Sequence, residues 1–154
     1  MSGMHAMTGK PPNPPVGRFD RLTADDPQVT DQHDAIFRIA MELADTWHGR
    51  GDAQRIRALL EKLGRVLESH FRYEERIFAA VGYPRLKEHK AEHKVILDEL
   101  KVIRGWLEQM GHGTAQIAPS FSVNNFILGV TVGHIGRSDM EFSAFARRAA
   151  QNEN

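Results

Sequence analysis

The stretch that decides the fold is HFRYEERIF at residues 70–78, which GYP follows at 82–84 and HKAEH at 89–93. Residues four apart lie on one face of an α-helix, so His70 and Glu74 point the same way. The two histidines of HKAEH share a face for the same reason. Because the Gly-Tyr-Pro break is short, the two helices are predicted to be antiparallel neighbours. Three imidazoles and a carboxylate can then meet between them, which outlines a metal site.

Composition excludes several classes of protein. The 154 residues hold 20 basic and 20 acidic side chains, so there is no electrostatic footprint for nucleic acid. No run of about 18 apolar residues could cross a membrane, and the N-terminus lacks a signal-peptide pattern. Cysteine is absent, which excludes disulfides, thiolate ligands and a cysteine nucleophile. We therefore expect one domain in the cytoplasm, with no membrane or nucleic-acid partner and no protein partner that the sequence identifies.

The chain divides into a leader and a helical body. Residues 1–18 are rich in proline and glycine and are expected to form a disordered leader. An irregular arm is expected from Phe19 to Val29, at the start of a body that spans 19–150. Apolar residues at spacings of three and four predict four helices, and no period-two pattern predicts a strand. The predicted fold class is therefore all-α, an up-down-up-down four-helix bundle with an N-terminal irregular arm.

Capping and breaking residues place the ends of these helices. Thr30 is expected to cap the first helix, which ends near His48, and Asp52 is expected to cap the second. Gly82 should end the second helix. The third is expected to start near Pro84, and the fourth to start at Ser120 or Ser122 and run to about Ala150.

The apolar stripes carry histidines and carboxylates where a plain bundle would have leucine. Burying such groups without partners would be costly, and a metal removes that cost by accepting their lone pairs. Five imidazoles, two bridging carboxylates and a shared solvent oxygen fill all but about one position of two octahedral metals. The candidate ligands are His33, His70, Glu74, His89, His93, His134 and Asp139.

The donor types narrow the choice of metal without fixing it. Mixed imidazole and carboxylate donors suit iron, manganese or zinc. A single tetrahedral zinc would leave three of the candidate ligands unused. The ferritin-like motif Glu-x-x-His does not occur in this chain, which argues against that class of di-iron protein.

Four spacings together resemble those of the hemerythrin family, specifically its single-domain bacterial members. The resemblance runs from about Phe19 to about Phe145. Myohemerythrin is itself a standard example of the up-down bundle. The matching motifs, in family order, are DQH at 31–33, HFxxEE at 70–75, HxxxH at 89–93 and HIxxxD at 134–139.

The resemblance implies a non-haem di-iron centre, two iron ions with a bridging oxo or hydroxo group, that binds O2. It implies that O2 binds at one open iron position as hydroperoxide, with no protein acid or base required. By matching positions, His89, His93 and His134 would hold one iron, His33 and His70 the other, which has the open position, and Glu74 and Asp139 would bridge.

The pocket for the small ligand departs from the family pattern. The family usually has Trp and Leu where this chain has Val130 and Thr131. We expect these two residues, with Phe37 and Phe71, to line the O2 pocket. The Thr131 hydroxyl could donate a proton to a bound oxygen and speed autoxidation, or it could bond a carbonyl of its own helix one turn back.

Three functions compete at this point. The first is O2 binding by a carrier, store or sensor, which is the leading interpretation. The second is a di-iron enzyme that acts on peroxide, O2 or nitric oxide, or an iron-donating repair protein, and little in the sequence separates it from the first. The third is a structural metal bundle, and the full ligand set with its open position argues against it. The remaining histidines, His5, His48 and His112, are expected to lie outside the site, and Glu75 is expected to face solvent or a neighbouring helix.

Overall fold

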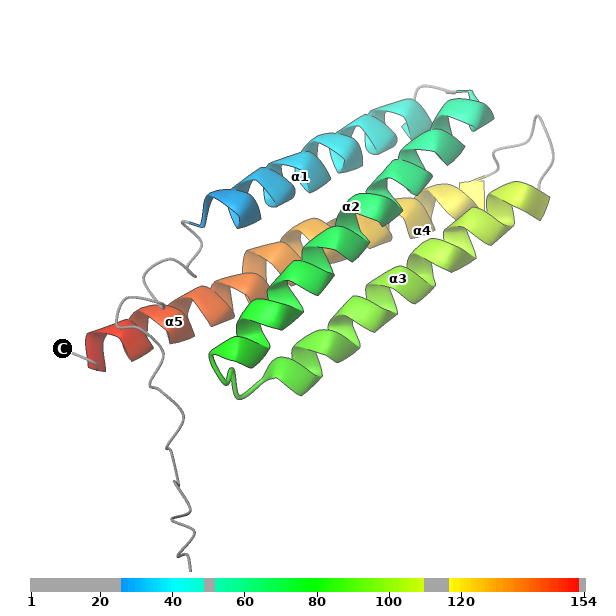
Figure 1. Ribbon diagram of the computed structural model, residues 1–154. Coiled ribbons are helices and arrows are strands. Elements are labelled where there is room, and N and C mark those ends of the chain that lie inside the picture. Colours follow the sequence, from blue (N-terminus) through cyan, green and yellow to red (C-terminus); the bar gives the residue numbers. More distant parts are fainter. Residues whose placement is uncertain (1–25, 49–51, 110–116, 153–154) are drawn as a thin grey trace, which may run out of the picture.

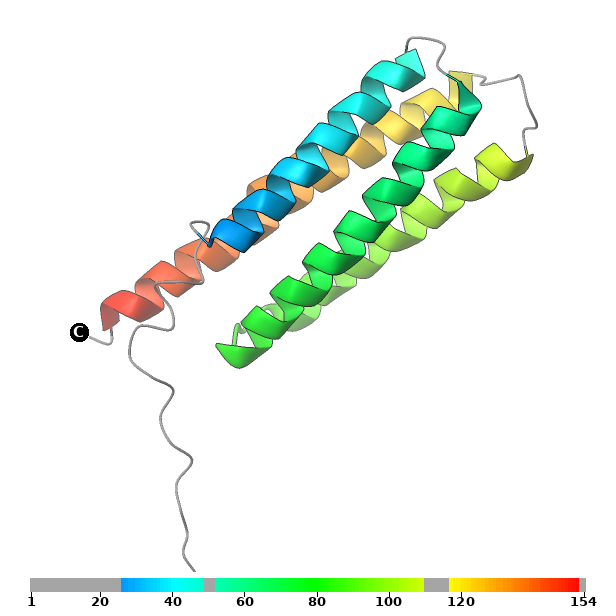
Figure 2. The same ribbon diagram turned by 45° about the horizontal axis from the view of Figure 1, so that its top comes forward.

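The computed structural model describes residues 26–48, 52–109 and 117–152, and the side chains of the last segment from 123. Over these residues the chain is helical, apart from the two helix-capping residues and one short turn. The elements are α1 (Pro27–His48), α2 (Ala53–Ala80), α3 (Leu86–Gln109), α4 (Ile117–Leu128), η1 (Gly129–Asp139) and α5 (Met140–Asn152). The last three follow one another without a break and form one rod, as Figures 1 and 2 show.

The four rods close into a bundle. Helix α1 packs on α2, α2 on α3, α3 on α4, and α4 returns to α1. Successive rods run in opposite directions, so the predicted all-α, up-down-up-down bundle is confirmed. The leader at 1–18 and the arm from Phe19 to residue 25 lie outside the described residues.

The first helix begins earlier than predicted. Asp26 accepts a hydrogen bond from the backbone N–H of Gln28 at 2.8 Å through Oδ1, and Pro27 occupies the first helical position. Proline suits that position because its missing N–H would have no helical partner there. The predictions that Thr30 caps the helix and that the arm reaches Val29 are therefore wrong.

The residues at other helix ends explain where those helices begin or end. The Asp52 side chain accepts from the N–H of Gln54 at 2.9 Å, which confirms the predicted cap of α2. Gly82, just beyond α2, has a φ of 67°, a conformation that glycine adopts without strain. The fourth rod starts at Ile117, before the predicted Ser120 or Ser122. Pro119 lies in its first turn, where a backbone N–H is not needed.

Two apolar clusters flank the middle of the bundle. The larger joins α1, α2, α3, α4 and η1, and it includes Phe71 and Ile135. The smaller surrounds Phe78 and Phe142 at the junction of α2 and α5. Phe71 stacks on His93 and Phe78 touches His89, so polar residues lie between the two clusters and are shielded from water on both sides.

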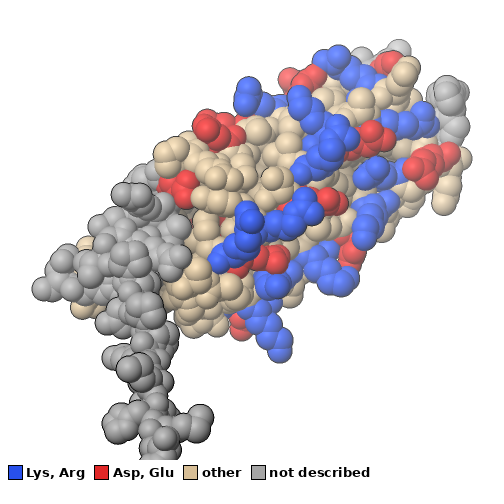
Figure 3. All heavy atoms as spheres, viewed as in Figure 1, with Lys and Arg blue, Asp and Glu red and all other residues tan. Residues whose placement is uncertain are grey.

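Basic and acidic side chains are interspersed on the face that Figure 3 shows. Lys94 pairs with Asp98, and Lys90 lies 3.3 Å from Glu75. Exposed pairs of this kind add little to stability. None of the described helices is long and apolar enough to cross a membrane, as the sequence predicted. The expectation about nucleic acid stays a prediction.

Candidate metal centre

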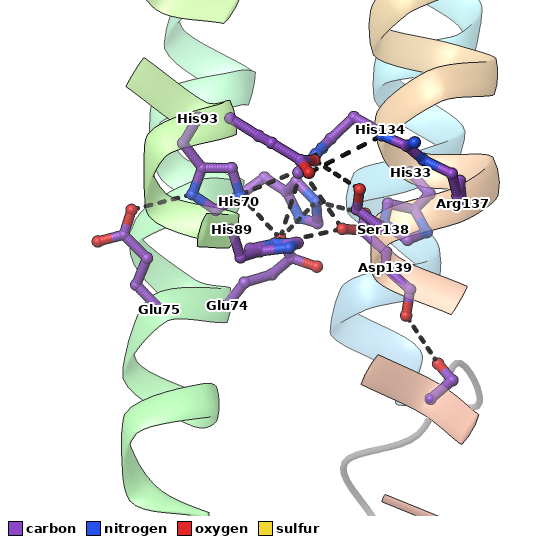
Figure 4. A network of polar contacts seen from close by, with 12 residues as sticks. His33, His70, Glu74, Glu75, His89, His93, His134, Arg137, Ser138 and Asp139 are labelled. Carbon is purple, nitrogen blue, oxygen red and sulfur yellow. Dashed lines mark hydrogen bonds and ion pairs between the residues drawn. The ribbon is translucent and has the colours of Figure 1, made fainter. Parts of the chain in front are cut away.

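The structure brings all seven candidate ligands together in the middle of the bundle (Figure 4). Six of them are buried, and His33 is the exception, with 18 % of its side chain exposed. The imidazole Nε2 atoms face inward. His33 Nε2 lies 3.1 Å from Asp139 Oδ2, and His93 Nε2 lies 3.1 Å from His134 Nε2.

The inward-facing atoms form two donor sets, each compact enough to hold one metal ion. Within each set, the ligand atoms all lie within 4.8 Å of one another. The sets share a single residue, Glu74. The first set is Glu74, His89, His93 and His134, and the second is His33, His70, Glu74 and Asp139.

The two carboxylates lie where they can serve both sets. Glu74 Oε2 is 3.4 Å from His70 Nε2 in one set and 3.3 Å from His89 Nε2 in the other. Asp139 divides its oxygens, because Oδ2 is 3.1 Å from His33 and Oδ1 is 3.3 Å from His134. Each carboxylate can therefore contact two cations at once, which makes the centre suitable for a pair of ions.

The helix η1 explains how His134 and Asp139 reach one centre. Their spacing of five residues covers about 1.4 turns of an α-helix, which would turn the two side chains well apart. Residues 129–139 instead form a π-helix, whose hydrogen bonds join residues five apart. The segment begins at Gly129 and ends at Asp139, and it holds both ligands on the inner face. π-Helical turns are rare and occur frequently at functional sites.

Three outer partners, which the sequence analysis did not identify as such, orient the imidazoles. The Nδ1 of His93 lies 2.9 Å from Glu75 Oε1, and the Nδ1 of His134 lies 3.2 Å from Glu92 Oε2. The Nδ1 of His70 lies 3.0 Å from Gln32 Oε1. A ring that donates through Nδ1 keeps the Nε2 lone pair free for a metal.

Each of these partners is the direct sequence neighbour of a candidate ligand, which is a signal that sequence analysis could have used. Gln32 precedes His33, Glu75 follows Glu74 and Glu92 precedes His93. The adjacent residue lies about 100° around the helix, where it faces the neighbouring rod. Glu92 also accepts a hydrogen bond from the Ser138 hydroxyl, which links α3 to η1.

Burial keeps three of the imidazoles unprotonated. Loss of hydration, together with neighbouring histidines, lowers the pKa of His89 to about 4 and that of His93 to about 2. Burial also lowers the pKa of His70. Near neutral pH these rings are therefore neutral, which is the form that binds metal.

The two buried carboxylates make the centre favourable for a bound cation. Burial, with the adjacent Asp139 carboxylate, raises the pKa of Glu74 well above its usual value. Burial would also raise the pKa of Asp139, but the hydrogen bond from His33 and the close His70 imidazole hold it below its usual range. His70 Nε2 and Asp139 Oδ1 are buried with no hydrogen-bond partner. Unpartnered buried polar atoms are costly, and a bound cation would satisfy both.

The expected pocket residues have mixed outcomes. Phe71 stacks on His93 with ring centroids 3.8 Å apart, and Val130 is buried in the larger apolar cluster. Phe37 is 39 % exposed, and its part in an O2 pocket stays a prediction. The Thr131 hydroxyl donates to the Ile127 carbonyl at 2.7 Å, which supports the second of its two predicted roles.

A cavity of about 60 Å³ adjoins the second donor set. Its lining includes His33, Glu74 and Asp139 of that set and also Met140, which is 47 % exposed. We call it the Met140 cavity. Its remaining lining residues are Val29, Ile77, Phe78, Ile135, Phe142 and Ser143.

The histidines expected outside the site can be placed only in part. His48 ends α1, is exposed, and lies 3.3 Å from Asn124 Oδ1 through Nε2. It is therefore no part of either donor set. His5 and His112 lie outside the described residues.

The fold and the donors together define a class, a helical bundle with a buried cation-binding centre. The family model described as the hemerythrin HHE cation binding domain matches residues 26–146. The chain belongs to the hemerythrin family, and the match includes all seven candidate ligands. Comparisons with curated proteins and with solved structures returned no match.

Proposed function

We propose that the chain binds two iron ions at this centre and, through them, binds O2 reversibly as a carrier, store or sensor. The observation that carries the proposal is the division of the donors into two sets joined by Glu74, with one oxygen of Asp139 toward each set. His89, His93 and His134 would hold one ion and His33 and His70 the other, with both carboxylates shared. Iron supplies the reversible electron exchange with O2 that side chains alone cannot provide.

The chain's own contribution is to hold and shield the donors. Glu75, Glu92 and Gln32 fix three imidazoles through their Nδ1 atoms, so each Nε2 faces the centre. Apolar clusters on both sides exclude water. Without water beside it, a bound ligand lacks a proton source. Its release unchanged is therefore favoured over its release in a protonated form.

The lining of the Met140 cavity favours binding over turnover. Apart from the three candidate ligands, the described residues that line it are apolar, except Ser143. The Ser143 hydroxyl donates to the backbone carbonyl of Asp139 at 3.3 Å, so its proton is engaged. Among the described residues that line the cavity, no acid or base beyond the candidate ligands is therefore available to drive a proton-dependent reaction.

The test combines metal analysis with visible spectra. Protein from iron-replete cells should contain two irons per chain, and anaerobic reduction followed by air should give a spectrum that reverses when O2 is removed. Glu74→Ala and Asp139→Ala should each lose the two bound metal ions, because each carboxylate faces both donor sets. His48→Ala should retain both metal ions. One ion per chain, or stoichiometric zinc, would refute the proposal. Catalytic consumption of peroxide without reversible O2 binding would support an enzyme instead.

A further inference from the structure

The lining of the Met140 cavity combines three residues of the second donor set with an exposed side chain. The cavity touches His33, the least buried of the seven candidate ligands, with Glu74 and Asp139. It also touches Met140, which is 47 % exposed and is the residue directly after Asp139 and the first of α5. A molecule in this cavity would therefore lie between a partly exposed side chain and the atoms predicted to hold metal.

Size and polarity limit what this cavity can admit. Its volume of about 60 Å³ exceeds the roughly 10–15 Å³ that a single water needs, so a molecule of two or three heavy atoms fits. The rest of its lining is mostly apolar, with Ile77, Phe78 and Ile135 among the residues. An anion would have to lose its hydration there without compensation, whereas an uncharged diatomic molecule would not.

Phe71 and Thr131, on another side of the centre, are both buried. Val130 is 1 % exposed, and the Thr131 hydroxyl is held by Ile127. A wider groove between α2 and α3 also reaches one ligand, His93, but Phe71 covers the face of that ring and Glu75 holds its Nδ1. That groove therefore meets the back of the imidazole and not the centre.

We propose that small uncharged ligands reach the centre through the Met140 cavity, and that Met140 controls their passage. The identity of the ligand as O2 rests on the function proposed above, but the route does not. Methionine suits the role of a gate because its unbranched side chain has three rotatable bonds and adapts to a passing molecule. The route is thus expected to affect rates of binding and release together.

The first test measures ligand kinetics in the metal-loaded, reduced protein by stopped flow with O2 and, separately, with nitric oxide. Met140→Trp should slow association and dissociation at least tenfold each and leave the affinity nearly unchanged, whereas Met140→Ala should speed both. Met41→Trp is the matched control, because Met41 is 57 % exposed on α1 and does not line the cavity. Unchanged rates in both Met140 variants, at full metal content, would overturn the proposal.

The second test does not depend on O2 chemistry. Crystals of the metal-loaded protein under xenon pressure should show xenon between Met140 and Asp139, and Met140→Trp should exclude it. Xenon only in the groove beside Phe71 would overturn the proposed route. If the protein binds nitric oxide and xenon through this cavity but never binds O2, the route stands and the proposed function fails.

Discussion

Asp26 offers the sharpest test of how the bundle holds its centre. The side chain is 8 % exposed and makes two hydrogen bonds with different roles. Oδ1 accepts from Gln28 N–H at 2.8 Å and caps α1, while Oδ2 accepts from the Tyr73 hydroxyl at 2.8 Å. Tyr73 precedes Glu74 on α2, and α1 carries His33. Asp26 therefore ties together the two helices that supply these ligands.

The chain contains a matched control, since Asp52 caps α2 with a bond of 2.9 Å to Gln54 N–H but is exposed. Loss of a cap costs about 1 kcal/mol, so Asp52→Ala should lower the free energy of unfolding by about that amount. Asp26→Ala should lose the cap and also the bond to Tyr73, which adds about 1.5–3 kcal/mol because the acceptor is charged. The expected difference between the two variants is therefore about 2 kcal/mol.

Urea unfolding, at one defined metal content, measures this difference. A double-mutant cycle with Tyr73→Phe should give a coupling energy of at least about 1 kcal/mol between Asp26 and Tyr73. For a domain of this size the melting temperature should fall about 2–4 °C for each kcal/mol lost. Equal losses for Asp26→Ala and Asp52→Ala, with no coupling in the cycle, would refute the reasoning.

Two further predictions concern protons and glycines. His89 and His93 have pKa values of about 4 and about 2 in the folded chain, below the usual 6.5, so the unfolded chain binds more protons below pH 6.5. The free energy of unfolding of metal-free protein should therefore fall as the pH drops from 6.5 toward 4, by up to about 1.4 kcal/mol per pH unit for each ring. Glu74, whose raised pKa acts in the opposite direction, offsets part of this loss, and equal urea midpoints at pH 7 and pH 5 would contradict the prediction. Gly105→Ala should raise the free energy of unfolding by roughly 0.5–1 kcal/mol, because the new Cβ in α3 would meet nothing within 4 Å. Gly82→Ala should lower the free energy of unfolding by about 1–2 kcal/mol, because Gly82 has a φ of 67°. Thermal melting measures both changes.

The sequence by itself determined the architecture, because the information is local and periodic. Apolar residues every three or four positions define the buried face of each rod, and short breaks such as the one at Gly82 force neighbouring rods to be antiparallel. The same periodicity placed His70 with Glu74 and His89 with His93, since residues four apart share a helix face. All seven candidate ligands meet in the structure, and for most of them this rule explains why.

Other features of the site depend on contacts between rods, and only the tertiary structure decided them. The π-helical segment at Gly129–Asp139 brings Asp139 beside His134, although a spacing of five on an α-helix would separate them. Glu75, Glu92 and Gln32 act across helix interfaces, so their position beside a ligand suggests a role but does not identify the imidazole that each one contacts.

The Met140 cavity shows the same division most clearly. The sequence predicted a ligand pocket around Phe37, Phe71, Val130 and Thr131, because family spacing identifies which residues flank a ligand but not how closely they pack. In the folded chain Phe37 is 39 % exposed and the hydroxyl of Thr131 bonds its own helix, while the cavity is lined by other residues, among them Met140. A cavity is the space that side chains from α1, α2, η1 and α5 leave unfilled together, so no single stretch of sequence encodes it.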